Sequence, residues 1–186
     1  MMASLDPKTT LVVMALPDES GLLFENANVK PLYTGIGQIK AAVNLTRSLE
    51  KFIPRAVLNF GTAGSFERTQ GHAVECSAFI QRSINKLGPH PKKIPAADVL
   101  TGMPKVVCGT ADFIQIEKFE SIHHEFDIMD MEAYALAYVC EQFQVPFYSF
   151  KYISDSSNTQ LKSDWKKNLL LAQKELFQVY LSLTGL

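Results

Sequence analysis

Short apolar runs alternate along the chain with longer stretches in which apolar residues recur at helical spacing. LVVMAL (11–16) and AVLNF (56–60) are continuous apolar runs, which are typical of strands buried on both faces of a sheet. AVECSAFIQR (73–82) alternates more loosely, as a longer strand nearer an edge would. The predicted strands cover residues 11–16, 31–34, 56–60, 73–82, 105–109 and 145–154.

Three stretches have the period and composition of helices. Residues 38–53 place their apolar side chains on roughly one side. Residues 128–143 contain strong helix formers and no glycine or proline. Residues 163–183 form a final amphipathic stretch, and Ser163 is suited to cap its start. We therefore expect helices over these three ranges.

Strands and helices follow one another in an order that indicates an α/β protein. The expected architecture is a three-layer α/β/α fold with a central mixed, largely parallel β-sheet, in a single domain over residues 1–186. The small-residue segment GTAGS (61–65) is predicted to be the turn that closes strand 56–60. The proline-rich segment 84–104 is predicted to be a long loop, and not a domain boundary, because strands resume after it.

Composition and charge exclude several classes of partner. The 186 residues include 18 basic and 19 acidic side chains, a formal net charge of −1 that gives no electrostatic case for a nucleic-acid partner. The first ten residues lack the pattern of a signal peptide, and no apolar run reaches the roughly 18 residues of a membrane span. The three cysteines lie far apart and lack metal-ligand spacing. We expect a cytoplasmic protein with no membrane partner, no metal and no cofactor.

Small residues and carboxylates follow several predicted strands, and a carboxylate opens the second helix. Ligands of open α/β sheets bind outside the carboxyl ends of the strands, where small residues allow close approach and separated carboxylates can serve as acid and base. Taken singly, each feature could be a turn, a helix cap or a dipole partner. Their repetition at successive strand ends favours a binding site. The candidates are Glu19, Ile36 between two glycines, Thr62 in GTAG, Phe113 after GTAD, Glu132 and Asp155.

The same segments carry a resemblance to a known family. LVVMALPDES, TGIGQIKAA, LNFGTAGSF, CGTADFI, MDMEAYALAYVCEQFQVPFYSFKYISDSSN and the closing DW…N helix match, in order, the purine nucleoside phosphorylase/nucleosidase superfamily. They look most like its 5′-methylthioadenosine/S-adenosylhomocysteine nucleosidase branch. The resemblance covers nearly the whole chain, and the segment from MEA to ISD is its most specific part.

The resemblance implies a division of roles around a purine nucleoside. Asp155 matches the general acid that protonates purine N7, so that the base leaves as a neutral group through an oxocarbenium-like state. This requires a carboxyl that is protonated at neutral pH, so we expect its pKa to be raised. Glu132 matches the glutamate that holds the ribose hydroxyls, and Met131 would pack against the ribose. Glu19 stands where the family has the acidic residue that orients the attacking water.

Four more residues complete the predicted substrate site. Phe113 matches the aromatic residue that stacks on the base, and Ile114 beside it offers backbone contacts to the purine edge. Thr62 stands where the family has a serine or threonine near the water or phosphate. Ile36 is included because of its place between two glycines at a strand end.

The chain also departs from the family pattern. Lys151 replaces the family's arginine just before ISD, and Ser157 and Asn158 replace the usual Ala-Asp after it. The acidic residue of the commoner SGDxFI motif is displaced to Asp112. The chain is shorter than typical nucleosidases between Gly71 and Thr101, which puts specificity for the 5′-alkylthio group in doubt.

These features predict a purine nucleosidase, with methylthioadenosine or S-adenosylhomocysteine as the first candidate substrates. A purine nucleoside phosphorylase is the alternative, but LNFG (58–61) lacks the arginine that the family's phosphorylases carry there, and Asp18 and Glu19 would repel phosphate. A non-catalytic nucleoside-binding or storage protein of the same fold is a further alternative. The small-molecule nucleoside is the expected partner, together with a second copy of the chain in a homodimer through the 84–104 loop or the 36–50 helix.

Overall fold

The computed structural model describes residues 5–83, 93–98, 100–113, 125–156 and 161–186, with the side chains of 161 and 162 left out. The eight strands found in these residues belong to one mixed sheet. They are β1 (Thr10–Met14), β2 (Leu32–Tyr33), β3 (Ala56–Gly64), β4 (Ala73–Gln81), β5 (Ile94–Pro95), β6 (Lys105–Thr110), β7 (Ile128–Asp130) and β8 (Phe147–Asp155).

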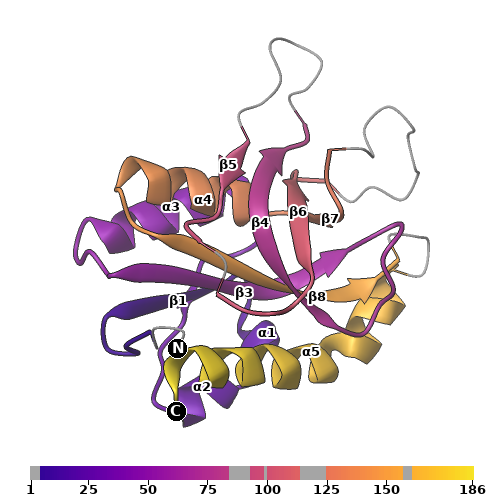
Figure 1. Cartoon of the computed structure of the whole chain (residues 1–186), viewed down its shortest axis with the longest axis horizontal. Coiled ribbons are helices and arrows are strands. Elements are labelled where there is room, and N and C mark those ends of the chain that lie inside the picture. Colours follow the sequence, from indigo (N-terminus) through magenta and orange to yellow (C-terminus); the bar gives the residue numbers. More distant parts are fainter. Residues whose placement is uncertain (1–4, 84–92, 99, 114–124, 157–160) are drawn as a thin grey trace.

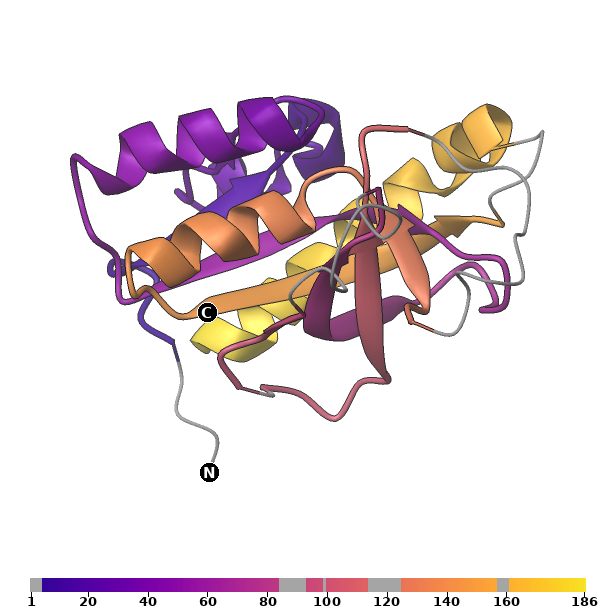
Figure 2. The same cartoon turned by 90° about the horizontal axis from the view of Figure 1, so that it is seen from above.

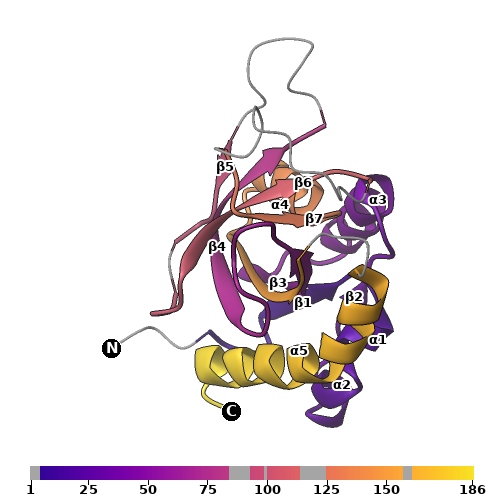
Figure 3. The ribbon, with the colours of Figure 1, turned by 90° about the vertical axis from the view of Figure 1, so that its right-hand side faces the viewer.

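Helices cover both faces of the sheet. They are α1 (Pro17–Ser20), α2 (Leu23–Asn26), α3 (Gln38–Leu49), α4 (Ala133–Gln142) and α5 (Leu161–Thr184). Helices α3 and α4 lie side by side on one face (Figure 2), and α5 lies with α1 and α2 on the other (Figures 1 and 3). This arrangement confirms the predicted α/β class with a central mixed sheet between helical layers. No helix within the described ranges combines the length and apolarity needed to cross a bilayer.

The sheet closes on itself. Strands β2, β1, β3 and β8 are parallel neighbours, and β8 continues into an antiparallel pairing with β4. Strand β4 pairs in parallel with β6, and β6 with β7. Strand β7 then returns to β3 through the antiparallel pair Gly64 and Met129, so that β3, β8, β4, β6 and β7 form a closed ring. As a result, the ends of strands that are far apart in sequence converge at one place.

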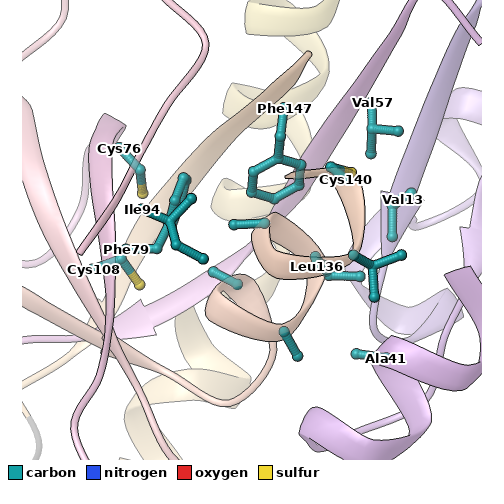
Figure 4. Close-up of a cluster of buried hydrophobic side chains, with 14 of the residues drawn as sticks. Val13, Ala41, Val57, Cys76, Phe79, Ile94, Cys108, Leu136, Cys140 and Phe147 are labelled. Atoms are coloured by element: carbon teal, nitrogen blue, oxygen red, sulfur yellow. The ribbon is translucent and has the colours of Figure 1, made fainter. Parts of the chain in front are cut away.

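Two apolar clusters hold the layers together. One lies between the sheet and helices α3 and α4, and Figure 4 shows Val13, Val57, Leu136 and Phe147 gathered in it. The other lies under α5 and is rich in aromatic rings, including Phe60 and Phe150, stacked 5.4 Å apart. Side chains alternate across a strand, so neighbouring residues of one strand supply both clusters.

Two local predictions are wrong. The segment predicted as a turn at 61–65 continues strand β3 as far as Gly64, because Gly61, Thr62 and Ala63 pair with Lys151, Tyr152 and Ile153 of β8. The predicted helix over 128–143 begins only at Ala133. Residues Ile128–Asp130 form strand β7 instead, because β6 offers them a parallel partner along Cys108–Thr110.

Smaller differences concern segments between the main elements. The predicted loop at 84–104 contains the short strand β5, which pairs antiparallel with Ala78 and Phe79, although residues 84–92 and 99 lie outside the described ranges. Helices α1 and α2 were not expected, since each has only four residues. Helix α3 ends at Leu49, four residues before the predicted end.

Candidate active site

A cavity of about 340 Å³ opens where the strand ends converge. Its wall comes from the ends of β3, β7 and β8 and from the residues that follow β1, β4, β6 and β7. Helix α1, the segment before α3 and the first part of α5 complete it. The lining residues are Ala15, Leu16, Glu19, Ile36, Thr62, Ala63, Gly64, Arg82, Phe113, Met129, Asp130, Met131, Glu132, Ser154, Asp155 and Trp165.

Seven of the eight site residues predicted from the sequence lie on this wall. They are Asp155, Glu19, Glu132, Met131, Phe113, Thr62 and Ile36. Ile114, together with Ser157 and Asn158, lies outside the described residues. The sequence reasoning missed Arg82, Asp130 and Trp165. The cavity therefore brings together candidates separated by more than a hundred positions, while their individual roles stay predictions.

Glu19 is held in one orientation by four donors. Its carboxylate folds back over the end of β1, where Oε2 accepts hydrogen bonds from the backbone N–H groups of Ala15 and Leu16, each at 3.1 Å. Oε1 accepts from the N–H of Thr62 at 3.0 Å and from its hydroxyl at 3.2 Å. The side chain is buried. These bonds fix a carboxylate between β1 and β3, at the edge of the cavity.

Trp165 links Thr62 to helix α5. Its indole Nε1–H donates to the Thr62 hydroxyl oxygen at 3.0 Å, so the same hydroxyl receives one hydrogen bond and gives another to Glu19. One turn later, the Asn168 amide donates to the backbone oxygen of Ser154 at 2.7 Å. The DW…N segment noted in the sequence is the signal for these contacts, since it places both side chains on the face of α5 nearest the site.

Glu132 is another carboxyl in the wall of the cavity. It is the residue before α4, and its Oε1 accepts the N–H of Gly37 at 2.8 Å. Burial raises its pKa to about 8, and the carboxylates of Asp130 and Glu19 act in the same direction, against the Lys151 ammonium and the Gly37 amide. The carboxyl is therefore readily protonated at neutral pH.

A buried ion pair lies next to Glu132. Lys151 Nζ is 2.9 Å from Asp130 Oδ2, and both side chains are almost fully buried. The Thr110 hydroxyl donates to Asp130 Oδ1 at 2.6 Å, and the N–H of Ala133 donates to Oδ2 at 2.8 Å. Burial alone would raise the pKa of Asp130, but Lys151 and these donors hold it below its ordinary value.

Lys151 is thus the cation of a buried polar cluster that includes Asp130 and Thr110. Burial alone would lower its pKa, but the neighbouring Asp130 carboxylate, together with Cys108, Glu132 and Glu19, raises it. A side chain added at Gly61 would begin 3.1 Å from Glu19 Oε1 and 3.3 Å from Lys151 Nζ, so the glycine leaves room for both groups. The departure from the family's arginine therefore keeps a positive charge at this position.

Asp155 ends strand β8 and is buried. The Ser154 hydroxyl donates to its Oδ2 at 2.9 Å, and its backbone oxygen accepts the N–H of Ser65 at 3.1 Å. The pairing of β8 with β3 fixes the backbone on either side of the cavity. The structure thus holds this carboxyl firmly in the wall, while its predicted raised pKa stays a prediction.

Phe113 forms an aromatic part of the wall and is 49% exposed. The guanidinium carbon of Arg82 lies 4.5 Å from the centre of its ring, and Arg82 itself is only 5% exposed. Asp112 directly precedes Phe113, and its carboxylate accepts the N–H of Gln38 at 2.7 Å. Arg82 directly follows strand β4, and a charged residue at a strand end is the signal that could have identified it.

The arrangement suits acid–base chemistry on a molecule with a flat apolar part and a hydroxylated part. Four buried carboxyl groups, those of Glu19, Asp130, Glu132 and Asp155, line one cavity, and Asp130 is paired with Lys151. The other three lie in different surroundings, and separated carboxyls can serve as acid, base and hydroxyl acceptor. An aromatic ring in the same wall offers a stacking surface. Across the described part of the chain, no group of three or more histidine, cysteine, aspartate or glutamate side chains is placed to hold a metal ion.

Comparisons with known proteins identify relatives of the chain by sequence. Residues 99–184 match the family model described as "Phosphorylase superfamily". A 5′-methylthioadenosine/S-adenosylhomocysteine nucleosidase of Psychromonas ingrahamii is 30% identical over 172 residues, covering 76% of this chain and 74% of that protein. The enzyme of the same name from Shewanella sediminis is 27% identical over 169 residues, covering 75% and 73%.

Solved structures share the fold. The nucleosidase of Colwellia psychrerythraea in complex with adenine superposes with a TM-score of 0.82 at 18% identity, covering 99% of this chain and 96% of that one. The nucleosidase of Neisseria meningitidis in complex with methylthio-immucillin-A gives 0.82 at 19% identity, covering 96% and 100%. The 30% identity to the Psychromonas ingrahamii enzyme over most of both sequences shows that the chain belongs to the 5′-methylthioadenosine/S-adenosylhomocysteine nucleosidase family of the phosphorylase superfamily.

Proposed function

We propose that this protein is a purine nucleosidase, which hydrolyses the N-glycosidic bond of a purine nucleoside and releases the free base. The observation that carries this proposal is the placement of Glu19, Glu132 and Asp155 around one cavity that also contains the ring of Phe113. Methylthioadenosine and S-adenosylhomocysteine rank first as substrates, because the relatives of known name are nucleosidases for these two compounds.

In the proposed reaction, Asp155, Glu19 and Glu132 each have one role. Asp155 donates a proton to N7 of the purine, so that the electrons of the glycosidic bond leave with a neutral base. A water molecule adds to the anomeric carbon of the oxocarbenium-like sugar and gives its proton to Glu19. Glu132 accepts hydrogen bonds from the ribose hydroxyls and keeps the sugar in register. The base stacks on Phe113, and Met131 packs against the sugar.

Hydrolysis is favoured over phosphorolysis by the charges at the place of attack. Glu19 lies there as a carboxylate with four donors on its oxygens, and it would repel a phosphate dianion while accepting a proton from water. Lys151 is paired with Asp130, and Arg82 donates to the backbone oxygens of Gly109 and Phe113. Both of these cations therefore have roles other than holding phosphate.

The protein should work as a homodimer. Ile36, Ile39 and Val43 are exposed at the start of α3, and Ile36 also lines the cavity. Ile39 is 78% exposed, and an apolar patch of this kind beside a cavity is typical of an interface. A second copy seated there would cover the mouth of the cavity and limit the access of water.

The cytoplasm is the proposed location, and one domain is the proposed organisation. All three cysteines carry free thiols and are buried, a state that suits a reducing compartment. The described strands share one sheet, which supports a single domain over residues 1–186.

The test is a nucleoside panel assayed without phosphate. Purified protein should release adenine from methylthioadenosine or S-adenosylhomocysteine, and the rates on adenosine, inosine and a 2′-deoxynucleoside would rank the specificity. Turnover that depends strictly on added phosphate would establish a phosphorylase instead. Binding without turnover would establish a storage protein, and equal rates on a pyrimidine nucleoside would overturn the purine assignment.

A further inference from the structure

Arg82 is a charged side chain in the cavity wall to which the proposed reaction gives no task. It follows β4, where its backbone N–H donates to the oxygen of Thr110 at 3.0 Å and extends the pairing with β6. Its side chain is almost completely buried, and burial lowers its pKa from the ordinary value, against the attraction of Asp130. Burying a guanidinium is costly unless its contacts compensate, so those contacts indicate what it does.

Two of the contacts involve Phe113. The Arg82 Nη2 donates to the backbone oxygen of Phe113 at 2.7 Å, and the guanidinium carbon lies over the ring of the same residue, 4.5 Å from its centre. Nε donates to the oxygen of Gly109 at 3.3 Å, which ties the group to strand β6. A guanidinium over an aromatic face is attractive, and more so where water is excluded. One side chain therefore holds both the backbone and the ring of a half-exposed residue that lies beyond the end of its strand.

Asp112, the residue before Phe113, is linked to helix α3 instead. Asp112 Oδ1 accepts the N–H of Gln38 at the start of α3, and the N–H of Gly37 is taken by Glu132. Helix α3 needs these acceptors because its N-cap is Gly37, which has no side chain to satisfy its first N–H groups. Carboxylates are also favoured at this end of a helix. Asp112 thereby connects the base side of the cavity to the part of the wall that holds Glu132.

We propose that Arg82 is a positioning residue that orders the ring of Phe113 for stacking on the purine base, with Asp112 as the second anchor of the same segment. The guanidinium covers one face of the ring, so in this proposal the base stacks on the opposite face. This inference rests on the proposed function, because it assumes that a base enters the cavity. Arg82 acts through Phe113, and neither Arg82 nor Asp112 takes part in proton transfer.

A stacking surface contacts the base before and during bond cleavage alike. Loss of its order should therefore weaken binding without slowing the chemical step, so KM rises while kcat stays nearly constant. Replacing Arg82 by methionine, which fills similar space without charge or donors, should raise KM and the Kd of free adenine by about tenfold. Arg82→Lys keeps the charge but not the planar fork, so it should recover only part of this loss.

The experiment measures adenine binding and methylthioadenosine turnover in four variants. Trp165 is the one tryptophan of the chain and lies on the cavity wall, so its fluorescence can report adenine binding directly. The variants are Arg82→Met, Arg82→Lys, Phe113→Leu and the double variant Arg82→Met/Phe113→Leu. Arg68→Met is the control, since this arginine pairs with Asp127 at 2.9 Å and is absent from the cavity wall.

The double variant decides the question. If Arg82 acts through the ring, Arg82→Met should weaken adenine binding about tenfold in the parent protein and less than twofold in the Phe113→Leu background. Equal losses in both backgrounds, or a large fall in kcat with unchanged KM, would overturn the inference. A parent protein that neither binds adenine nor releases base would overturn the proposed function and the inference with it. Parent activity together with an unaffected Arg82→Met variant would overturn the inference alone.

Discussion

At the scale of single residues, the carboxyl groups of the cavity differ in what surrounds them. Glu19 accepts hydrogen bonds from three backbone N–H groups and one hydroxyl of the protein. Glu132 has one such donor and lies near another carboxylate, so its pKa is raised to about 8. Residues of one chemical type can thus take different roles, as the proposed reaction requires.

Glu19→Gln should abolish hydrolysis because an amide cannot take the proton of the attacking water. We expect kcat to fall by about 10²–10⁴-fold, with KM changed little. An amide would also turn its NH₂ group toward two of the present donors in either orientation, so some loss of stability should accompany the change. Steady-state kinetics on methylthioadenosine would check this, with Glu50→Gln at the exposed end of α3 as the control. Retention of parental kcat would remove Glu19 from the mechanism.

Asp155→Asn should stop base release while preserving binding, because the amide keeps the shape of the side chain but is far too weak an acid to protonate N7. A loss of about 10²–10⁴-fold in kcat is expected. Adenine titration through Trp165 fluorescence would show whether the cavity still forms. Asp18→Asn, at an exposed position of α1, is the matched control. Near-parental turnover in Asp155→Asn would make this residue structural.

Glu132 should give the ligand-free protein a stability that falls as pH rises. Its pKa is about 8 in the folded chain and 4.5 ordinarily, so below about 4.5 the carboxyl is protonated in both states and its contribution is complete. Between these values the unfolded chain releases the proton that the folded chain keeps, a loss of up to roughly 1.4 kcal/mol per pH unit. Above about 8 the loss from this group is complete.

Urea unfolding across this pH window would measure the effect. Glu132→Gln cannot titrate, so the variant should show a shallower fall in the free energy of unfolding between about pH 5 and pH 8. The difference between the two proteins isolates Glu132 from every other titrating group. Identical slopes in both proteins would contradict the raised pKa.

At the scale of elements, β7 and β8 are joined across the core by the pair Asp130 and Lys151. Lys151→Met should destabilise the fold by about 3–5 kcal/mol, because it leaves a buried carboxylate without its cation. Adding Asp130→Asn should restore part of the loss, since the second change removes the uncompensated charge. Arg68→Met breaks a partly exposed pair and should cost about 1 kcal/mol or less. Thermal unfolding of the four proteins would rank them, and equal losses for the lysine and arginine variants would contradict the argument.

The elements also show how far sequence reasoning reaches. Strands such as β1 and β3 were predicted because a continuous apolar run is a local property of the chain. Strand β7 was predicted as helix because Ile128–Asp130 has no local strand pattern, and only the partner β6 makes it one. The extension of β3 through Gly64 likewise depends on β8, a strand far along the chain. Non-local pairing overrode local preference in both places.

The site residues that sequence reasoning found differ in the same way from those that it missed. Glu19, Glu132 and Asp155 were found because carboxylates at strand and helix ends stand out, and because the family motifs include them. Arg82 was missed because, in the sequence, it is only a polar residue at the end of a predicted strand. Its contact with Phe113 forms only when β4 and β6 pair. Asp130 was missed for a similar reason, since its partner Lys151 belongs to another strand.

At the scale of the whole molecule, the exposed apolar start of α3 makes the oligomeric state testable. Ile39→Lys should convert the proposed homodimer to a monomer, because it puts a charge in the centre of the patch formed with Ile36 and Val43. Light scattering at micromolar concentration would give the mass, and KM should rise if the second copy covers the cavity. Lys51→Glu, at an exposed position beyond the end of α3, controls for a change of charge. A parent protein that is monomeric and active would refute the dimer.

The closed ring of strands has a consequence for the order of events during folding. The cavity wall contains the ends of β3 and β8, and Val57 of β3 pairs with Phe147 of β8 only after a long stretch of chain has been brought together. Joining distant segments costs chain entropy before their contacts repay it, so this pairing belongs to a late and slow stage. The ring is then completed where Gly64 meets Met129. A chain in which β8 has not yet joined the sheet therefore lacks Asp155 and one wall of the cavity, so the candidate site forms only when this pairing is made.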